Sequence, residues 1–151
     1  MHFLRDALSQ VDCHSGSVVI IGLGNEFRHD DAVGLVAARR LHGLEHEGDI
    51  GDLIASWEGL ESVILIDAVS SAAAPGTIHR LDVSVSPVPR RLFQNSTHAL
   101  CLADAIELSR VMGTLPGEVV IYGIEVRDTT AGIGLSPEVT KALEALITEL
   151  R

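Results

Sequence analysis

Two short apolar runs constrain the fold of this chain more than any other feature of its sequence. Residues 18–21 and 63–66 are unbroken aliphatic stretches, and a glycine turn or an aspartate follows each of them. A strand with one face in water would alternate apolar and polar residues, whereas a run without alternation is typical of a parallel strand covered on both faces. We therefore predict that both runs are buried strands of a largely parallel sheet.

The rest of the chain alternates between helical and strand patterns. Asp30 is a plausible cap of a helix that follows it, and Ser136-Pro137 is a typical start of the last helix. Further helices are predicted at 52–57 and 97–112, further strands at 77–81 (at the edge of the sheet) and 118–124, and a loop at 84–96. Strands alternating with helices predict a three-layer α/β/α sandwich with a mainly parallel central sheet.

The length and charge of the chain limit its partners. Its 151 residues suit a single domain over residues 1–151, of which residues 1–16 are expected to be flexible or peripheral. The 11 Lys and Arg against 21 Asp and Glu give a net charge of −10. Because a net-acidic surface repels phosphates, we expect neither nucleic acid nor an anionic membrane as a partner.

Targeting and redox signals are absent from the sequence as well. No apolar run approaches the ~20 residues that span a bilayer, and residues 1–17 do not resemble a signal peptide. The two cysteines form neither a CxxC pair nor a disulfide framework. We therefore expect a cytoplasmic protein.

Three polar residues are placed where a sheet of this kind binds its ligands, beyond the carboxyl ends of the strands. Asp31 follows the first strand, Asp67 ends the second apolar run, and His98 lies in the first turn of the helix predicted at 97–112. Two carboxylates and an imidazole are a donor set suited to a divalent transition metal. His29 is a possible accessory. Helix capping for Asp31, turn capping for Asp67 and simple surface exposure for His98 are the structural alternatives, and spacing alone leaves them open.

The surroundings of these residues bear on their charge. Asp67 adjoins an apolar run, so its carboxyl should be partly desolvated and its pKa raised unless a cation or hydrogen bonds compensate. The positive potential at a helix start disfavours imidazolium at His98, and neutral imidazole is the form that binds metals.

The turn Gly22-Leu23-Gly24-Asn25 opens like a dinucleotide-binding fingerprint. Phe27 occupies the third glycine position, however, and Asp30 and Asp31 would repel a pyrophosphate at the helix start. Nucleotide binding is therefore a weak alternative, and no organic cofactor is expected. The sequence also lacks the G-x-S-x-G and H-E-x-x-H patterns of serine and zinc hydrolases.

Four segments resemble, in order, the motifs of the [NiFe]-hydrogenase maturation endopeptidases. They are Gly22-Leu23-Gly24-Asn25 with Asp30-Asp31-Ala32-Val33-Gly34, Ile64-Leu65-Ile66-Asp67-Ala68-Val69 followed by Pro75-Gly76-Thr77, Ser96-Thr97-His98-Ala99-Leu100, and Gly134-Leu135-Ser136-Pro137-Glu138-Val139. The resemblance implies an aspartic-type, metal-dependent peptidase that cuts the C-terminal extension from the precursor of a hydrogenase large subunit after nickel insertion.

The resemblance also assigns roles to residues. The family's metal-contacting acid, Asp and His match Asp31, Asp67 and His98, which are therefore predicted to be catalytic and to contact nickel supplied by the substrate. As a further hypothesis, Asn25 at the glycine turn and the loop residues Arg90 and Arg91 are candidate substrate contacts. A solvated basic loop is the structural alternative for the two arginines.

One departure from the family pattern affects the sheet. Residues 44–60 are short and lack the family's Gly-Thr-x-Gly turn, so one strand is expected to be truncated or missing. A chaperone-like module that binds the metallated precursor without hydrolysis is the main alternative function.

Overall fold

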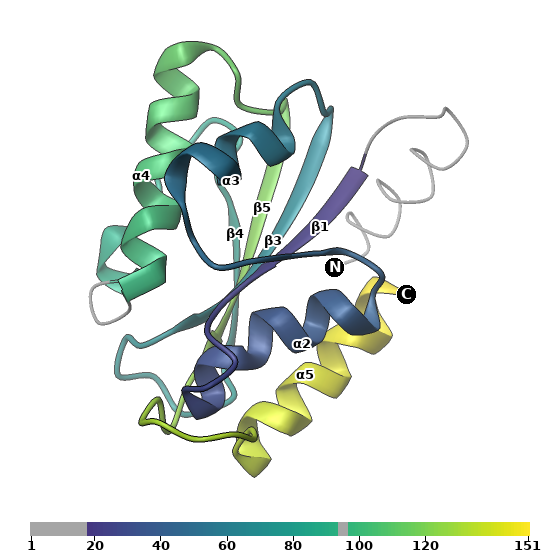
Figure 1. Cartoon of the computed structure of the whole chain (residues 1–151), viewed down its shortest axis with the longest axis vertical. Coiled ribbons are helices and arrows are strands. Elements are labelled where there is room, and N and C mark those ends of the chain that lie inside the picture. The colour runs from purple at the N-terminus through teal and green to yellow at the C-terminus, as the bar shows by residue number, and fades with distance from the viewer. Residues whose placement is uncertain (1–17, 94–96) are drawn as a thin grey trace.

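The protein is an α/β sandwich with one mixed sheet between two layers of helices (Figure 1). The computed structural model describes residues 18–93 and 97–151, and gives only the backbone for residues 97–101. The expectations for residues 1–16, including Cys13, lie outside the described residues. The three-layer architecture predicted from the sequence is confirmed.

The sheet has five strands in the order β2-β1-β3-β5-β4. The strands are β1 (Val18–Leu23), β2 (Leu44–His46), β3 (Ser62–Val69), β4 (Ile78–Asp82) and β5 (Glu118–Glu125). All neighbouring strands pair in parallel except β4, which runs antiparallel to β5 at one edge. Both apolar runs are central strands, and every residue of β3 is buried, as the absence of polar alternation predicts.

Helices cover the two faces in pairs (Figure 1). They are α2 (Val33–Arg40) and α5 (Pro137–Leu150) on one face, and α3 (Ile50–Trp57) and α4 (Thr97–Met112) on the other. Two 3-10 turns, η1 (His29–Ala32) and η2 (Arg90–Phe93), precede α2 and α4. The turn η2 lies in the segment predicted as a loop. None of the helices in the described ranges is long and apolar enough to cross a membrane.

The segment that departs from the family pattern, where a strand was expected to be truncated or missing, contains one short strand. Strand β2 is only three residues long and pairs in parallel with the end of β1. Helix α3 follows, and the Asp49 carboxylate caps it by accepting a 2.9 Å hydrogen bond from the Asp52 N–H. Trp57 ends α3, is fully buried, and donates a hydrogen bond of 2.9 Å to the Ser109 hydroxyl of α4.

Each face of the sheet has its own apolar core. Leu65 and Val69 of β3 pack with α3 and α4, whereas Ile64 and Ile66 pack with α2 and α5. Because side chains alternate between faces along a strand, Asp67 belongs to the α3/α4 face.

Two glycines let α2 lie directly on the sheet. A methyl group at Gly34 of α2 would overlap the backbone oxygens of Leu23 and Ile66, and one at Gly22 of β1 would overlap the Gly34 carbonyl. This close packing holds η1, which leads into α2, at the carboxyl edge of β1 and β3.

The substitution Gly34→Ala tests this packing, with Gly51→Ala as its control in another helix. Gly34→Ala should destabilise the fold by roughly 3 kcal/mol, because backbone atoms have to move apart. A methyl group at Gly51 would meet only the Asp49 side chain, at 3.4 Å, so Gly51→Ala should gain about 0.5–1 kcal/mol from helix propensity. Urea unfolding measures both, and equal effects would contradict the role of Gly34.

Candidate functional site

Two buried aspartates meet at the carboxyl edge of the sheet. Asp31, on η1, is 4% exposed, and Asp67, on β3, is 0% exposed. They lie close enough for the charge of Asp31 to raise the pKa of Asp67. The structure therefore brings together two of the three residues predicted to form the site. It corrects one detail, because β3 continues to Val69 and Asp67 lies inside the strand rather than after it.

The Asp67 carboxyl receives few hydrogen bonds from the protein. Its Oδ1 accepts a 2.8 Å hydrogen bond from the Ala68 N–H, while its Oδ2 is buried and has no hydrogen-bond partner. Burial raises the pKa of Asp67 well above its usual value and the charge of Asp31 adds to this effect, whereas the Ala68 N–H opposes it. Desolvation of Asp67 was predicted from the sequence, and the structure confirms it.

Asp31 is held by the backbone of the glycine turn. Its N–H donates to the Arg28 carbonyl at 3.0 Å, and its own carbonyl accepts from the Asn25 N–H at 3.3 Å. A side chain at Gly24 would overlap that carbonyl. Helix α2 begins at Val33, and its N-cap residue Ala32 supplies no side-chain cap.

The neighbouring Asp30 has a different role. The sequence predicted it as a helix cap, but its carboxylate instead accepts hydrogen bonds from the segment before α5. The donors are the N–H groups of Arg127 at 2.9 Å, Asp128 at 3.0 Å and Ser136 at 2.6 Å, and the Ser136 hydroxyl at 2.8 Å. The cap prediction is therefore wrong, because Asp30 anchors the 127–136 segment. Ser136 precedes α5 as predicted, but its hydroxyl binds Asp30 rather than the helix.

The third predicted member, His98, is placed only by its backbone. It is the second residue of α4, so it lies in a first helical turn as predicted. Its side chain and that of Cys101 lie outside the described residues. No three described His, Cys, Asp or Glu side chains are grouped for a metal ion. Metal binding by Asp31, Asp67 and His98 stays a prediction.

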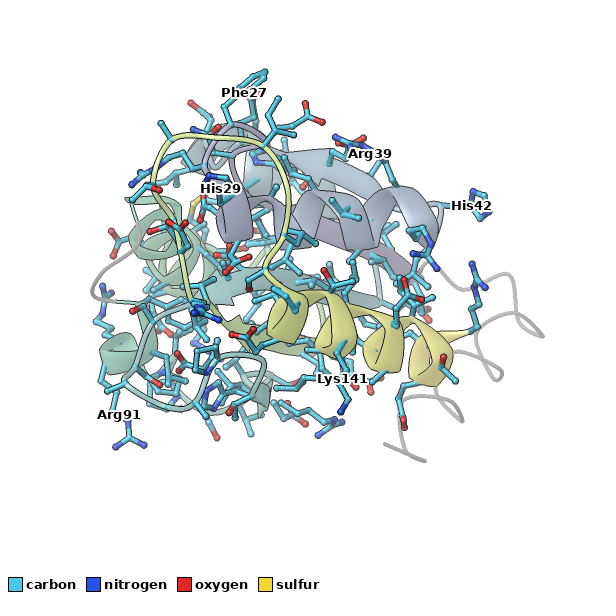
Figure 2. The ribbon with its side chains drawn as sticks, turned by 90° about the horizontal axis from the view of Figure 1, so that it is seen from below. Phe27, His29, Arg39, His42, Arg91 and Lys141 are labelled. Carbon is cyan, nitrogen blue, oxygen red and sulfur yellow. The ribbon has the colours of Figure 1, made fainter. Side chains whose placement is uncertain are left out.

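The predicted substrate contacts lie around the same edge. The Asn25 side chain makes a local contact, in which its Oδ1 accepts a 3.0 Å hydrogen bond from the Phe27 N–H. Arg90 forms an exposed ion pair with Asp104 at 2.8 Å. Arg91 projects outward from η2 (Figure 2). Their roles toward a substrate stay predictions.

His29 lies under the segment that precedes α5 (Figure 2). Its backbone has a φ of 44°, and its Nδ1 is 3.1 Å from the Gly134 carbonyl oxygen. Gly132 packs so closely on the ring that a side chain there would overlap it. These contacts let His29 help to close the loop, and an accessory catalytic role for it stays a prediction.

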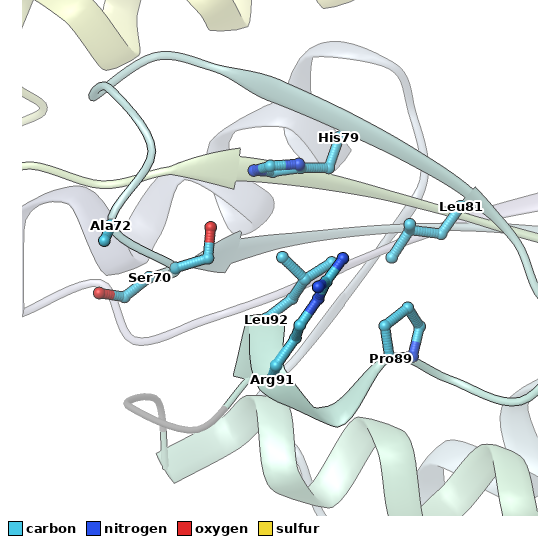
Figure 3. Close-up of a pocket in the computed structure, with 8 residues that line it drawn as sticks. Ser70, Ala72, His79, Leu81, Pro89, Arg91 and Leu92 are labelled. Carbon is cyan, nitrogen blue, oxygen red and sulfur yellow. The ribbon is translucent and has the colours of Figure 1, made fainter.

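A cavity of about 610 Å³ opens where β3 ends and β4 begins (Figure 3). The loop after β3, strand β4 and the segment around η2 line it, including Ser70, Ser71, His79, Leu81, Pro89 and Arg91. The buried Glu125 at the end of β5 stands behind it and accepts a 3.0 Å hydrogen bond from His79 Nε2 and one of 3.1 Å from the Ser71 N–H. The Ser71 hydroxyl also donates to Glu125.

Sequence reasoning missed this second cluster. Glu125 comes at the end of an apolar run just as Asp67 does, so the same signal was available in the sequence. Its partners His79 and Ser71 are distant in sequence and carry no spacing pattern.

Comparison with known proteins agrees with this geometry. Residues 48–151 match the family model of the HycI hydrogenase maturation proteases. The chain belongs to the hydrogenase maturation protease family. A proposed hydrogenase maturation protease of Methanocaldococcus jannaschii is 26% identical over an alignment of 144 residues, and the match covers 86% of this chain and 91% of that protein.

Solved structures of maturation proteases share the fold. The hydrogenase maturating endopeptidase HybD from Escherichia coli is 27% identical, with a TM-score of 0.75 and 88% of both chains covered. A maturation protease HybD from Thermococcus kodakarensis is 25% identical, with a TM-score of 0.67, 87% of this chain and 95% of that chain covered. A hydrogenase maturation protease is a peptidase, so the nucleotide-binding alternative loses its support.

The raised pKa of Asp67 makes stability depend on pH. The neutral carboxyl is favoured in the fold, so its contribution is complete below the pKa of the unfolded chain and is lost as pH rises through the higher pKa of the folded state. Asp67→Asn, which is always neutral, should therefore melt at a higher temperature than wild type near neutral pH. The gain is about 1.4 kcal/mol per unit of pKa rise and should vanish near pH 4. Thermal melts from acidic to neutral pH measure it, with the exposed Asp52→Asn as control; a gain independent of pH would contradict the assignment.

The anchoring role of Asp30 makes a separate prediction. Asp30→Asn should destabilise the fold by roughly 2–3 kcal/mol, because an amide NH₂ would face N–H donors. Ser136→Ala removes only the hydroxyl and should cost about 1 kcal/mol. Chemical unfolding measures the cost, and hydrogen exchange should show faster opening of residues 127–136. An Asp30→Asn protein as stable as wild type would show that the anchor is unimportant.

Proposed function

We propose that this protein is an endopeptidase that removes the C-terminal extension of a nickel-loaded [NiFe]-hydrogenase large-subunit precursor. The buried Asp31–Asp67 pair carries the proposal, since two carboxylates are held together at the edge of the sheet where such folds bind ligands. Membership of the maturation protease family supports the peptidase activity.

The same pair supports recognition of a cation. Burying two acids side by side costs free energy that a cation would offset, and Asp67 Oδ2 has no hydrogen-bond partner within the protein. With the imidazole of His98, the donors would be two oxygens and one nitrogen, which suits nickel. We propose that the nickel belongs to the substrate and marks the precursor as ready. Its positive charge would hold the precursor's metal-binding segment against Asp31, Asp67 and His98.

The chain's own groups can then supply the proton transfers of hydrolysis. A carboxylate of the pair takes a proton from water as the water oxygen bonds to the scissile carbonyl carbon. The proton passes to the amine nitrogen as the C–N bond breaks. A carboxyl with a raised pKa suits both steps, because it holds a proton more readily than an ordinary aspartate and can then return it. Asn25, Arg90 and Arg91 would orient the substrate around this centre.

We also propose a cytoplasmic location. Support comes from the two cysteines, which form no CxxC pair and no disulfide framework in the sequence.

Intact-mass spectrometry of the precursor tests the activity. Wild type should shorten the nickel-loaded large subunit at its C-terminus and leave the nickel-free form whole. Asp31→Asn and Asp67→Asn should each slow cleavage at least about a hundredfold, as expected when a general base or a metal contact is lost. The exposed Asp52→Asn is the matched control and should cut at the wild-type rate.

The same experiment separates the alternatives. A precursor that binds but keeps its mass would indicate a module without hydrolytic activity. Cleavage by both Asp31→Asn and Asp67→Asn at the wild-type rate would disprove the assigned site.

A further inference from the structure

We propose that the precursor's peptide, after passing the Asp31–Asp67 pair, crosses the cavity beside His79 and binds as an added strand on the outer edge of β4. This inference rests on the proposed function and adds to it a site for the substrate segment away from the scissile bond. The occupant is an extended stretch of polypeptide, since its recognition would come from main-chain hydrogen bonds.

The backbone of β4 is arranged for this pairing. The Glu125 N–H donates to the Thr77 carbonyl, and the Val83 N–H donates to the Val119 carbonyl. In an antiparallel ladder these bonds recur at every second residue, so the odd-numbered residues of β4 bond to β5. Those of even number, Ile78, Arg80 and Asp82, turn their N–H and C=O groups away from the sheet.

The outer edge of β4 has no partner strand in the described ranges. Strand β4 is the last in the sheet order, and no described backbone group outside β5 bonds to the backbone of residues 78–82. Unpaired edges of this kind are templates for another strand.

The cavity lies beside β4, on the same face of the sheet as Asp67. Asp67 of β3 lies opposite Gly123 of β5, and Gly123 lies opposite His79 of β4. The three residues form one row across the sheet, so Asp67 and His79 share the α3/α4 face. The cavity lies on that face, bounded by the end of β3 and by η2 (Figure 3).

Glu125 keeps the two sides of the cavity in place. Its hydrogen bonds to His79 and Ser71 tie the start of β4 to the loop after β3. Arg91, on the rim, has no ion pair among the described residues. In a chain of net charge −10, this guanidinium is suited to a carboxylate of the bound peptide.

Strand spacing sets how far the bound segment lies from the cut. An added strand would be three spacings from β3, or about 14 Å at ~4.8 Å each. An extended peptide covers this in about four residues. The segment paired with β4 should therefore begin about four residues from the scissile bond, outside the part of the precursor that holds nickel.

A matched pair of substitutions at Arg80 tests the added strand. Arg80→Pro removes the outward N–H, and a proline facing away from the neighbouring strand is tolerated at a sheet edge. Arg80→Ala removes the same side chain and keeps the N–H. Binding of the nickel-loaded precursor should weaken at least about fivefold in Arg80→Pro relative to Arg80→Ala, as expected for one lost hydrogen bond. Thermal melts check that both variants are folded.

The measurement is informative whether or not the precursor is cut. If the precursor is cut, KM should be higher in Arg80→Pro than in Arg80→Ala, with kcat unchanged. If it is not cut, the dissociation constants of the two variants for the precursor are compared directly. Hydrogen exchange of the wild type should also slow over residues 78–82 when the nickel-loaded precursor is added.

Several results would overturn the inference. One is that Arg80→Pro and Arg80→Ala bind the precursor with equal affinity. Another is that the precursor leaves hydrogen exchange at residues 78–82 unchanged. A third is that exchange there slows only as the concentration of this chain rises, which would mean that a second copy occupies the edge. Loss of cleavage with binding retained at β4 would refute the proposed hydrolysis alone.

Discussion

The contact between helix α2 and the backbone of β1 and β3 is the constraint on which the candidate site depends. Gly22 and Gly34 allow main-chain atoms of the helix and the sheet to touch. Because η1 leads directly into α2, this contact fixes the position of Asp31 relative to the strands. Asp67 is fixed by its place in a central strand that is buried on both faces. Two rigid elements thus hold the acids together, and no flexible loop has to do so.

The environment gives the three acids of this region different roles. Asp30 is buried but accepts hydrogen bonds from four donor groups, so its charge is well compensated. Asp67 is equally buried, has only the Ala68 N–H, and faces the charge of Asp31, which keeps its pKa high. A buried acid without compensation is costly to the fold, and such groups are found most often where chemistry needs them. We therefore assign function to Asp67, the buried acid that accepts only one hydrogen bond.

Much of the fold could be predicted from local sequence. The two aliphatic runs, the 97–112 helix and the edge strand near 77–81 were all predicted, because burial on both faces and helical periodicity leave direct marks on the sequence. The distinction between Asp30 and Asp31 could not be predicted, since it depends on Arg127, Asp128 and Ser136, about a hundred residues away. The Glu125 cluster was missed for the same reason: His79 and Ser71 reach it only after β4 pairs with β5. The 3-10 turn η1 also escaped prediction, because its two acids resemble an ordinary helix cap.

Burial and the charge of Asp31 favour the neutral form of Asp67, and a bound cation would favour its charged form. Its titration can be followed directly by the ¹³C chemical shift of the side-chain carboxyl in labelled protein. The account predicts a pKa well above the ordinary value for aspartate. This pKa should fall toward the ordinary value in Asp31→Asn, and it should fall in the wild type when the nickel-loaded precursor is added. A carboxyl that titrates near pH 4, whether or not Asp31 and the precursor are present, would contradict it.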